Sequence, residues 1–109
     1  MATTYKVLGQ SNPSATTATT LYTVPSATQT VVSTIVVCNQ AASAATFRIA
    51  VRPAGATLAA QHYVAYDVTV GASDSTALTL GLTLGATDVV TIYGSTATLS
   101  FSAYGSEIA

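Results

Sequence analysis

Residues 46–52 read Thr-Phe-Arg-Ile-Ala-Val-Arg and are followed directly by Pro53-Ala54-Gly55. In this stretch Phe47, Ile49 and Val51 alternate with smaller or more polar neighbours. Because successive side chains of a strand point to opposite faces of a sheet, the alternation predicts a strand with one buried and one outward face. Proline and glycine immediately after it predict that the strand ends in a turn.

Segments of the same kind recur along the chain, separated by clusters of Gly, Pro, Asn, Ser and Asp. They are rich in Val, Ile, Thr and Tyr, and none has the period of a helix. The predicted strands are residues 5–9, 20–24, 30–39, 46–52, 61–70, 75–80 (continued by Leu82 and Leu84), 89–93 and 98–105. Their short connections leave no room for crossover helices. We therefore predict an all-β fold, a single antiparallel β-sandwich of jelly-roll or immunoglobulin-like topology.

The apolar sides of these strands define the predicted core, because in a sandwich they face the opposite sheet. The core residues predicted in this way are Phe47, Ile49, Val51, Val64, Tyr66, Val68, Leu78, Leu80, Leu99 and Phe101.

Residues 1–19 are predicted to form an extended N-terminal arm, and residues 20–109 the sandwich domain. The arm carries a short apolar strand, which is followed in residues 10–19 by small side chains with nothing large to bury. One interpretation is a loosely packed terminus. The other, which we favour, is a strand-exchange arm that pairs with the edge of a neighbouring subunit. Tyr5, Val7 and Leu8 are then the predicted assembly interface.

The chain is poor in charge: 109 residues hold 3 Lys and Arg and 4 Asp and Glu. That is 6% charged residues, where soluble domains average about 25%. Such a surface suits a protein that packs against neighbours, and it offers no basic patch for nucleic acid or an anionic membrane. The N-terminus MATTYKVLGQ lacks the apolar segment of a signal peptide, so we expect synthesis in a cytoplasm without export.

Few side chains are suited to catalysis. With His62 as the single histidine, neither a conventional triad nor a His-based metal site can form within one chain. A metal site built from three copies of His62 is a remote alternative. Cys38, the single cysteine, lies in a Val-rich run and is expected to be a buried structural thiol. We predict no enzymatic activity, no catalytic residue, no metal and no cofactor.

The acidic residues are expected to have structural roles. Asp74 and Asp88 each precede a predicted strand, where a carboxylate can accept hydrogen bonds from the backbone of a turn. Asp67 lies within a strand and is expected to pair with Arg48 or Arg52. The tyrosines are expected to pack in the core and in interfaces, although they could also line a sugar-binding surface.

Several segments resemble small structural proteins of tailed bacteriophages, including cyanobacterial and marine phages. They are LYTVP (21–25), VVSTIVVCN (31–39), FRIAVR (47–52), TDVVTIY (87–93) and LSFSAYGSEI (99–108). The likeness lies in strand endings and turn residues. It implies an assembled component of the virion, made in the host cytoplasm.

The expected function is that of a capsid decoration or cement protein which bridges capsid subunits. A homo-oligomer, with a trimer favoured, and the major capsid protein are the expected partners. The alternative is a tail, baseplate or fibre module, which could also contact host-surface glycans. A carbohydrate-binding module is a third hypothesis. Nucleic acid and membrane are not expected as partners.

Overall fold

The computed structural model describes residues 2–109 and confirms the predicted all-β fold. Between the fourth and fifth strands lie two single-turn 3-10 helices, η1 (Pro53–Gly55) and η2 (Ala60–His62). The strands are β1 (Thr3–Ser11), β2 (Thr19–Thr23), β3 (Gln29–Asn39), β4 (Ala45–Arg52), β5 (Tyr63–Val70), β6 (Ser75–Leu84), β7 (Val89–Gly94) and β8 (Leu99–Ile108).

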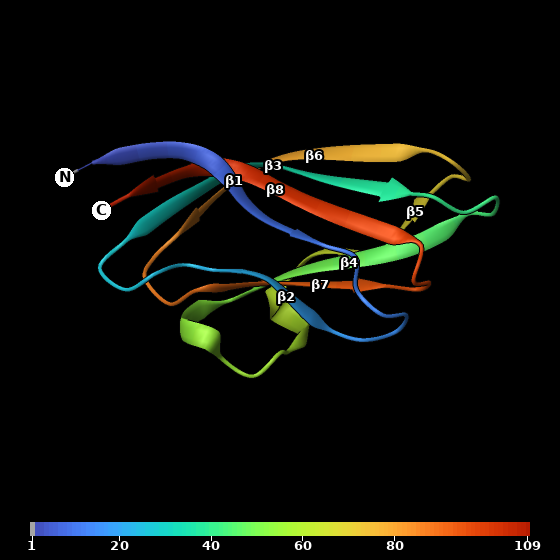
Figure 1. Cartoon of the computed structure of the whole chain (residues 1–109). Coiled ribbons are helices and arrows are strands. Elements are labelled where there is room, and N and C mark those ends of the chain that lie inside the picture. Colours follow the sequence, from blue (N-terminus) through green and yellow to red (C-terminus); the bar gives the residue numbers. More distant parts are fainter. Residues whose placement is uncertain (1) are drawn as a thin grey trace.

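The strands form two antiparallel four-stranded sheets, in the orders β1-β8-β3-β6 and β2-β7-β4-β5. Figure 1 shows the two sheets as layers, one above the other. The chain pairs like one long hairpin that is rolled onto itself, with its tip between β4 and β5. The paired strands of this hairpin are β1·β8, β2·β7, β3·β6 and β4·β5. This order is that of a jelly roll, so the structure decides between the two topologies that the sequence left open.

The core lies between the inner faces of the two sheets. Phe47 of β4 and Phe101 of β8 are fully buried and meet edge to face, with ring centroids 6.1 Å apart. The predictions of Ile49 and Leu99 as core residues are also confirmed, since both have no exposed surface. The other predicted residues that pack against this core are only partly buried: Val51, Val68, Leu78 and Leu80.

The core predictions for Val64 and Tyr66 are wrong, because these side chains are 44% and 57% exposed. The physical reason is a β-bulge in β5. The strand holds one residue more than β4 between the pairing positions Ala65 and Val68, and Asp67 has a φ of 51°. The extra residue reverses the alternation, so the side chains that face the core on one side of the bulge are out of phase with those on the other.

The predicted arm is also corrected by the structure. Thr3–Ser11 is a strand of the sandwich, the edge strand β1, which pairs along its length with β8 of the same chain. A small residue of this segment also allows β1 to approach β2. A Cβ at Gly9 would overlap the carbonyl oxygen of Leu21, so the close approach requires glycine. Residues 12–18 form the connection to β2. Pairing of β1 with a neighbouring subunit stays a prediction.

Candidate interaction surfaces

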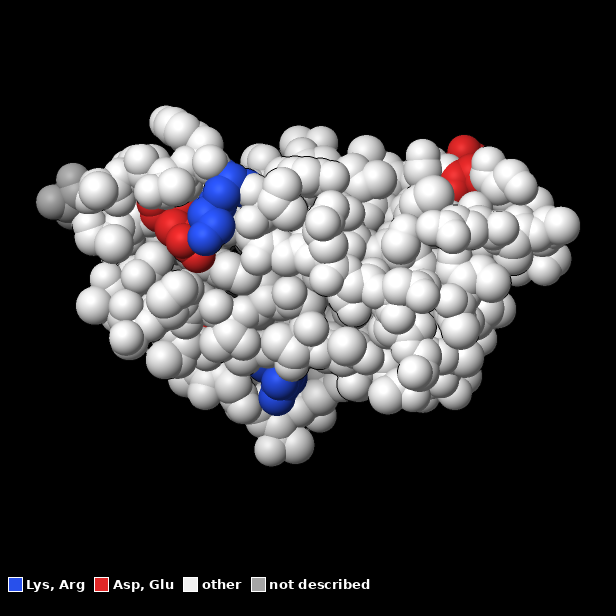
Figure 2. All heavy atoms as spheres, in the orientation of Figure 1, with Lys and Arg blue, Asp and Glu red and all other residues white. Residues whose placement is uncertain are grey.

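Charged side chains are few, and each of them is engaged within the chain. Figure 2 shows coloured atoms in only a few small spots on an otherwise uncharged face. Lys6 Nζ lies 3.3 Å from Glu107 Oε1, and Arg48 Nε lies 2.7 Å from Asp67 Oδ1. The second pair confirms the predicted partner of Asp67. Arg52 donates to Thr91 Oγ1 at 3.0 Å.

The acidic residues predicted to serve turns do so. Asp74 Oδ1 accepts a hydrogen bond of 2.8 Å from the backbone N–H of Ser75. Asp88 accepts from the backbone N–H groups of Ala54 and Gly85, at 2.8 and 2.9 Å. Both carboxylates therefore fix loops at the ends of strands, a structural role.

The single histidine and the single cysteine lie in different elements, η2 and β3. His62 ends η2 instead of lying in the predicted strand, and its Nδ1 accepts a hydrogen bond of 3.1 Å from the Ala59 N–H. Cys38 on β3 is half-buried, where the sequence predicted a buried thiol. Within residues 2–109, His, Cys, Asp and Glu side chains form no group of three that could hold a metal ion.

The first candidate surface lies on the outer face of the sheet that contains β1. We call it the β1 surface and define it by the groove-lining residues Tyr5, Val7, Val31, Ser33 and Tyr104. Tyr5 is 84% exposed, and Val7 and Tyr104 are 47% and 37% exposed. The groove has a volume of about 600 Å³. Of the predicted interface residues, Tyr5 and Val7 lie here, whereas Leu8 packs against the core.

A line of β-bulges crosses the sheet under the β1 surface. The register shifts at Leu8 in β1, at Ser33 in β3 and at Gly81 in β6, which has a φ of 61°. Ser33 Oγ donates a hydrogen bond of 3.1 Å to the Tyr104 carbonyl oxygen and so joins the bulge in β3 to β8. Bulges bend and twist the strands that carry them. Two residues that line the groove lie at these shifts: Val7 directly precedes the shift in β1, and Ser33 is the extra residue in β3.

A carboxylate beside the β1 surface joins the two sheets. Glu107 of β8 accepts hydrogen bonds from Tyr22 of β2 and from Lys6 of β1, at 2.5 and 3.3 Å. The Tyr22 hydroxyl also shares a hydrogen bond of 2.8 Å with Thr30 of β3. The hydrogen bond from Tyr22, and then that from Lys6, lowers the pKa of Glu107. Burial, and then the bond to Glu107, raises the pKa of Tyr22 to about 12.

The second candidate surface lies on the outer face of the other sheet. Arg48 of β4 lies between the rings of Tyr66 and Tyr93, with Cζ 4.1 and 4.4 Å from their centroids. The bulge in β5 brings Asp67 to the same guanidinium. Its hydrogen bond raises the pKa of Arg48 above the ordinary value. The result is a cation held between two aromatic faces and neutralised by one carboxylate.

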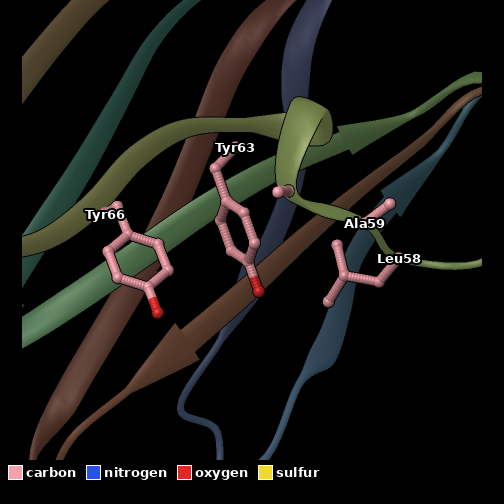
Figure 3. A pocket seen from close by; sticks show the side chains of 5 residues that line it. Leu58, Ala59, Tyr63 and Tyr66 are labelled. Atoms are coloured by element: carbon pink, nitrogen blue, oxygen red, sulfur yellow. The ribbon is translucent and has the colours of Figure 1, made fainter.

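An open pocket of about 500 Å³ adjoins Tyr66. We call it the tyrosine pocket, and it is lined by Leu58, Ala59, Ala60, Tyr63 and Tyr66. The rings of Tyr63 and Tyr66 meet edge to face, with centroids 5.0 Å apart. Figure 3 shows Tyr63 between Tyr66 and Leu58, with both tyrosine hydroxyls pointing to the same side. The strand β5 supplies the tyrosines, and η2 with the preceding loop supplies the other wall.

Sequence reasoning predicted that Asp67 pairs with Arg48 or Arg52, of which Arg48 is the partner, but it missed the tyrosine pocket. Strict alternation assigned Tyr66 to the core, and nothing marked Leu58 as its neighbour. One signal was present: Asp67 interrupts an apolar strand, and Asp is among the few residues that adopt a positive φ readily. An aspartate at such a position is a candidate for a bulge.

No family model, no curated protein and no solved structure matches this chain. The helical segments of residues 2–109 are single turns, none of which is long and apolar enough to cross a membrane.

Proposed function

We propose that this chain is a non-enzymatic structural protein of a tailed-phage virion, a decoration or cement protein on the exterior of the capsid. It binds further copies of itself, with a trimer favoured, and the major capsid protein, and it is made in the host cytoplasm. The jelly roll agrees with this proposal, since capsid domains are among the proteins that use it. Because lectins and cupins share the fold, the fold alone does not decide the function, and the surface features must distinguish the candidates.

The observation that carries the proposal is the β1 surface. Tyr5, Val7 and Tyr104 expose large apolar side chains in one groove, and tyrosine is enriched in protein interfaces. The surface includes an edge strand, whose free backbone groups can pair with another chain. An apolar face next to an open edge fits association by burial and backbone pairing.

The charges support the same conclusion. Since Lys6 pairs with Glu107 and Arg48 with Asp67, few ions remain to attract a charged partner from a distance. A protein of this kind loses little energy by desolvating ions when it packs against a neighbour. The scarcity of free titratable groups also argues against an enzyme.

The experiment is a count of copies per particle. Particles of the phage whose genome encodes this chain are purified, and the chain is quantified by mass spectrometry against the major capsid protein. A decoration protein is expected in amounts comparable to the capsid subunit. A handful of copies per particle would favour the alternative, a tail, baseplate or fibre module. Absence of the chain from purified particles would overturn the proposal.

A further inference from the structure

The tyrosine pocket has the dimensions and lining of a small-molecule site. Its volume of about 500 Å³ lies within the range of ligand pockets, which are mostly apolar with a few polar groups. Leu58, Ala59 and Ala60 provide apolar wall, whereas Tyr63 and Tyr66 add aromatic rings with hydroxyl tips. It lies on the sheet opposite the β1 surface, so the two surfaces are separate.

The pocket is built from a departure from regular strand geometry. Without the bulge at Asp67, the alternation of β5 would send Tyr66 toward the core. Instead Tyr66 is 57% exposed, and Arg48 packs on its ring at 4.1 Å. Asp67 then fixes Arg48 through a hydrogen bond of 2.7 Å. An aromatic ring held in place before the ligand arrives costs less ordering on binding.

The chemistry of these groups selects the ligand. The two charges beside the pocket, Arg48 and Asp67, neutralise each other, so neither an anion nor a cation is favoured. The aromatic rings offer electron-rich faces to C–H bonds, and the hydroxyls of Tyr63 and Tyr66 both donate and accept hydrogen bonds. A sugar ring carries an apolar C–H face and a rim of hydroxyls. We infer that the tyrosine pocket binds a short neutral saccharide.

This inference goes beyond the proposed assembly role and does not depend on it. A structural protein on a particle surface can present a saccharide site on its free face while the opposite sheet contacts the particle. The two proposals therefore fail separately: loss of saccharide binding leaves the copy number in particles unchanged.

The test is a titration of the full chain, labelled with ¹⁵N, followed through its backbone amide resonances. The probes are the neutral sugars lactose, maltotriose and chitotriose, with heparin tetrasaccharide as a charged comparison. At least one neutral sugar is expected to shift amides of residues 58–67. Tyr66→Ala should weaken that binding about tenfold or more, which corresponds to about 1.4 kcal/mol. Tyr63→Phe, which removes only a hydroxyl, should weaken it less.

Tyr5→Ala is the matched control, since Tyr5 is still more exposed than Tyr66 and lies on the other sheet. It should leave saccharide binding unchanged. Tyr66 is largely exposed, and an otherwise unchanged amide spectrum of Tyr66→Ala will show that the variant is folded. Three results would overturn the inference: no shift with any neutral sugar, a shift that survives Tyr66→Ala, or binding of heparin alone. Concentration-dependent shifts of residues 58–67 without sugar would identify a second copy as the occupant and overturn it as well.

Discussion

The hydroxyl of Tyr22 in one sheet donates a hydrogen bond of 2.5 Å to the carboxylate of Glu107 in the other. Lys6 of the edge strand bonds the same carboxylate, so a single side chain connects β1, β2 and β8. The β1 surface is supported directly by this network. The stability of the sandwich is therefore expected to depend on the ionisation of Glu107.

The first prediction concerns acid stability. The folded-state pKa of Glu107 lies below its unfolded value, so its contribution is present above the unfolded pKa and is lost as pH falls through the folded pKa. At neutral pH, Glu107→Gln should lower the free energy of unfolding by about 1–3 kcal/mol relative to the wild type, measured by urea denaturation. The difference should shrink as the pH is lowered through the folded-state pKa of Glu107, below the ordinary range of a glutamate, because the wild-type carboxylate is then protonated.

Tyr22→Phe serves as a companion variant, since it removes the main cause of the lowered pKa. Like Glu107→Gln, it should make the free energy of unfolding less dependent on acid pH than it is in the wild type. Equal acid dependence in the wild type and both variants would show that Glu107 titrates normally in the folded protein.

The second prediction concerns Gly105, where β8 passes close to β3. A Cβ at this position would overlap the backbone carbonyl oxygen of Val31, which belongs to a paired strand and cannot move freely. Gly105→Ala should destabilise the fold by about 3 kcal/mol or more, measured by chemical denaturation. Gly71→Ala is the control, because its added Cβ would make only ordinary contacts with Asp74, and its effect should stay within about 0.5 kcal/mol. Similar losses in the two variants would contradict the close approach of β8 and β3.

The third prediction concerns the bulge that creates the tyrosine pocket. Both Asp67→Gly and Asp67→Ala remove the ion pair with Arg48, but only glycine adopts a φ of 51° without strain. The glycine variant should therefore be more stable than the alanine variant by about 1 kcal/mol in urea denaturation. In a regular strand the order is the reverse, so a more stable alanine variant would show that β5 has no bulge in solution.

The periodicity of the sequence was sufficient to predict the class of fold. Phe47 and Ile49 follow the pleat of β4, which is regular against β7, so alternation places them correctly. In β5 the same reasoning misplaced Val64 and Tyr66, because one extra residue inverts the faces and its effect is visible only in the pairing with β4. Local pattern cannot report a register that a partner strand determines.

The N-terminal segment shows the other limit of sequence reasoning. Small residues without an apolar periodicity suggested a free arm, yet β1 is held by backbone hydrogen bonds to β8, which do not depend on side chains. Gly9, which ended the predicted strand 5–9, allows close packing on Leu21. The order of strands in the jelly roll likewise depends on long-range pairing, so the sequence left two topologies open.

The fourth prediction concerns the β1 surface. Because β1 covers the edge of β8, deletion of residues 2–12 would expose that edge and damage the sandwich along with any interface. Point substitutions separate the two effects: Tyr5→Ser with Val7→Ser changes only exposed side chains and should alter stability by less than about 1 kcal/mol. The double variant should sediment as a monomer where the wild type forms an oligomer. Thr79→Ala, at an exposed position of β6, is the control and should leave the oligomer intact. An unchanged oligomer in the double variant would contradict assembly through this surface.

A cryo-electron microscopy reconstruction of the purified particle would show whether this chain assembles on a virion through the β1 surface. We expect density for the jelly roll on the exterior of the capsid, with Tyr5 and Val7 buried against a neighbouring copy or a capsid subunit. Assembly through the β1 surface would be ruled out by a particle that lacks this density, or by one in which Tyr5 and Val7 face solvent.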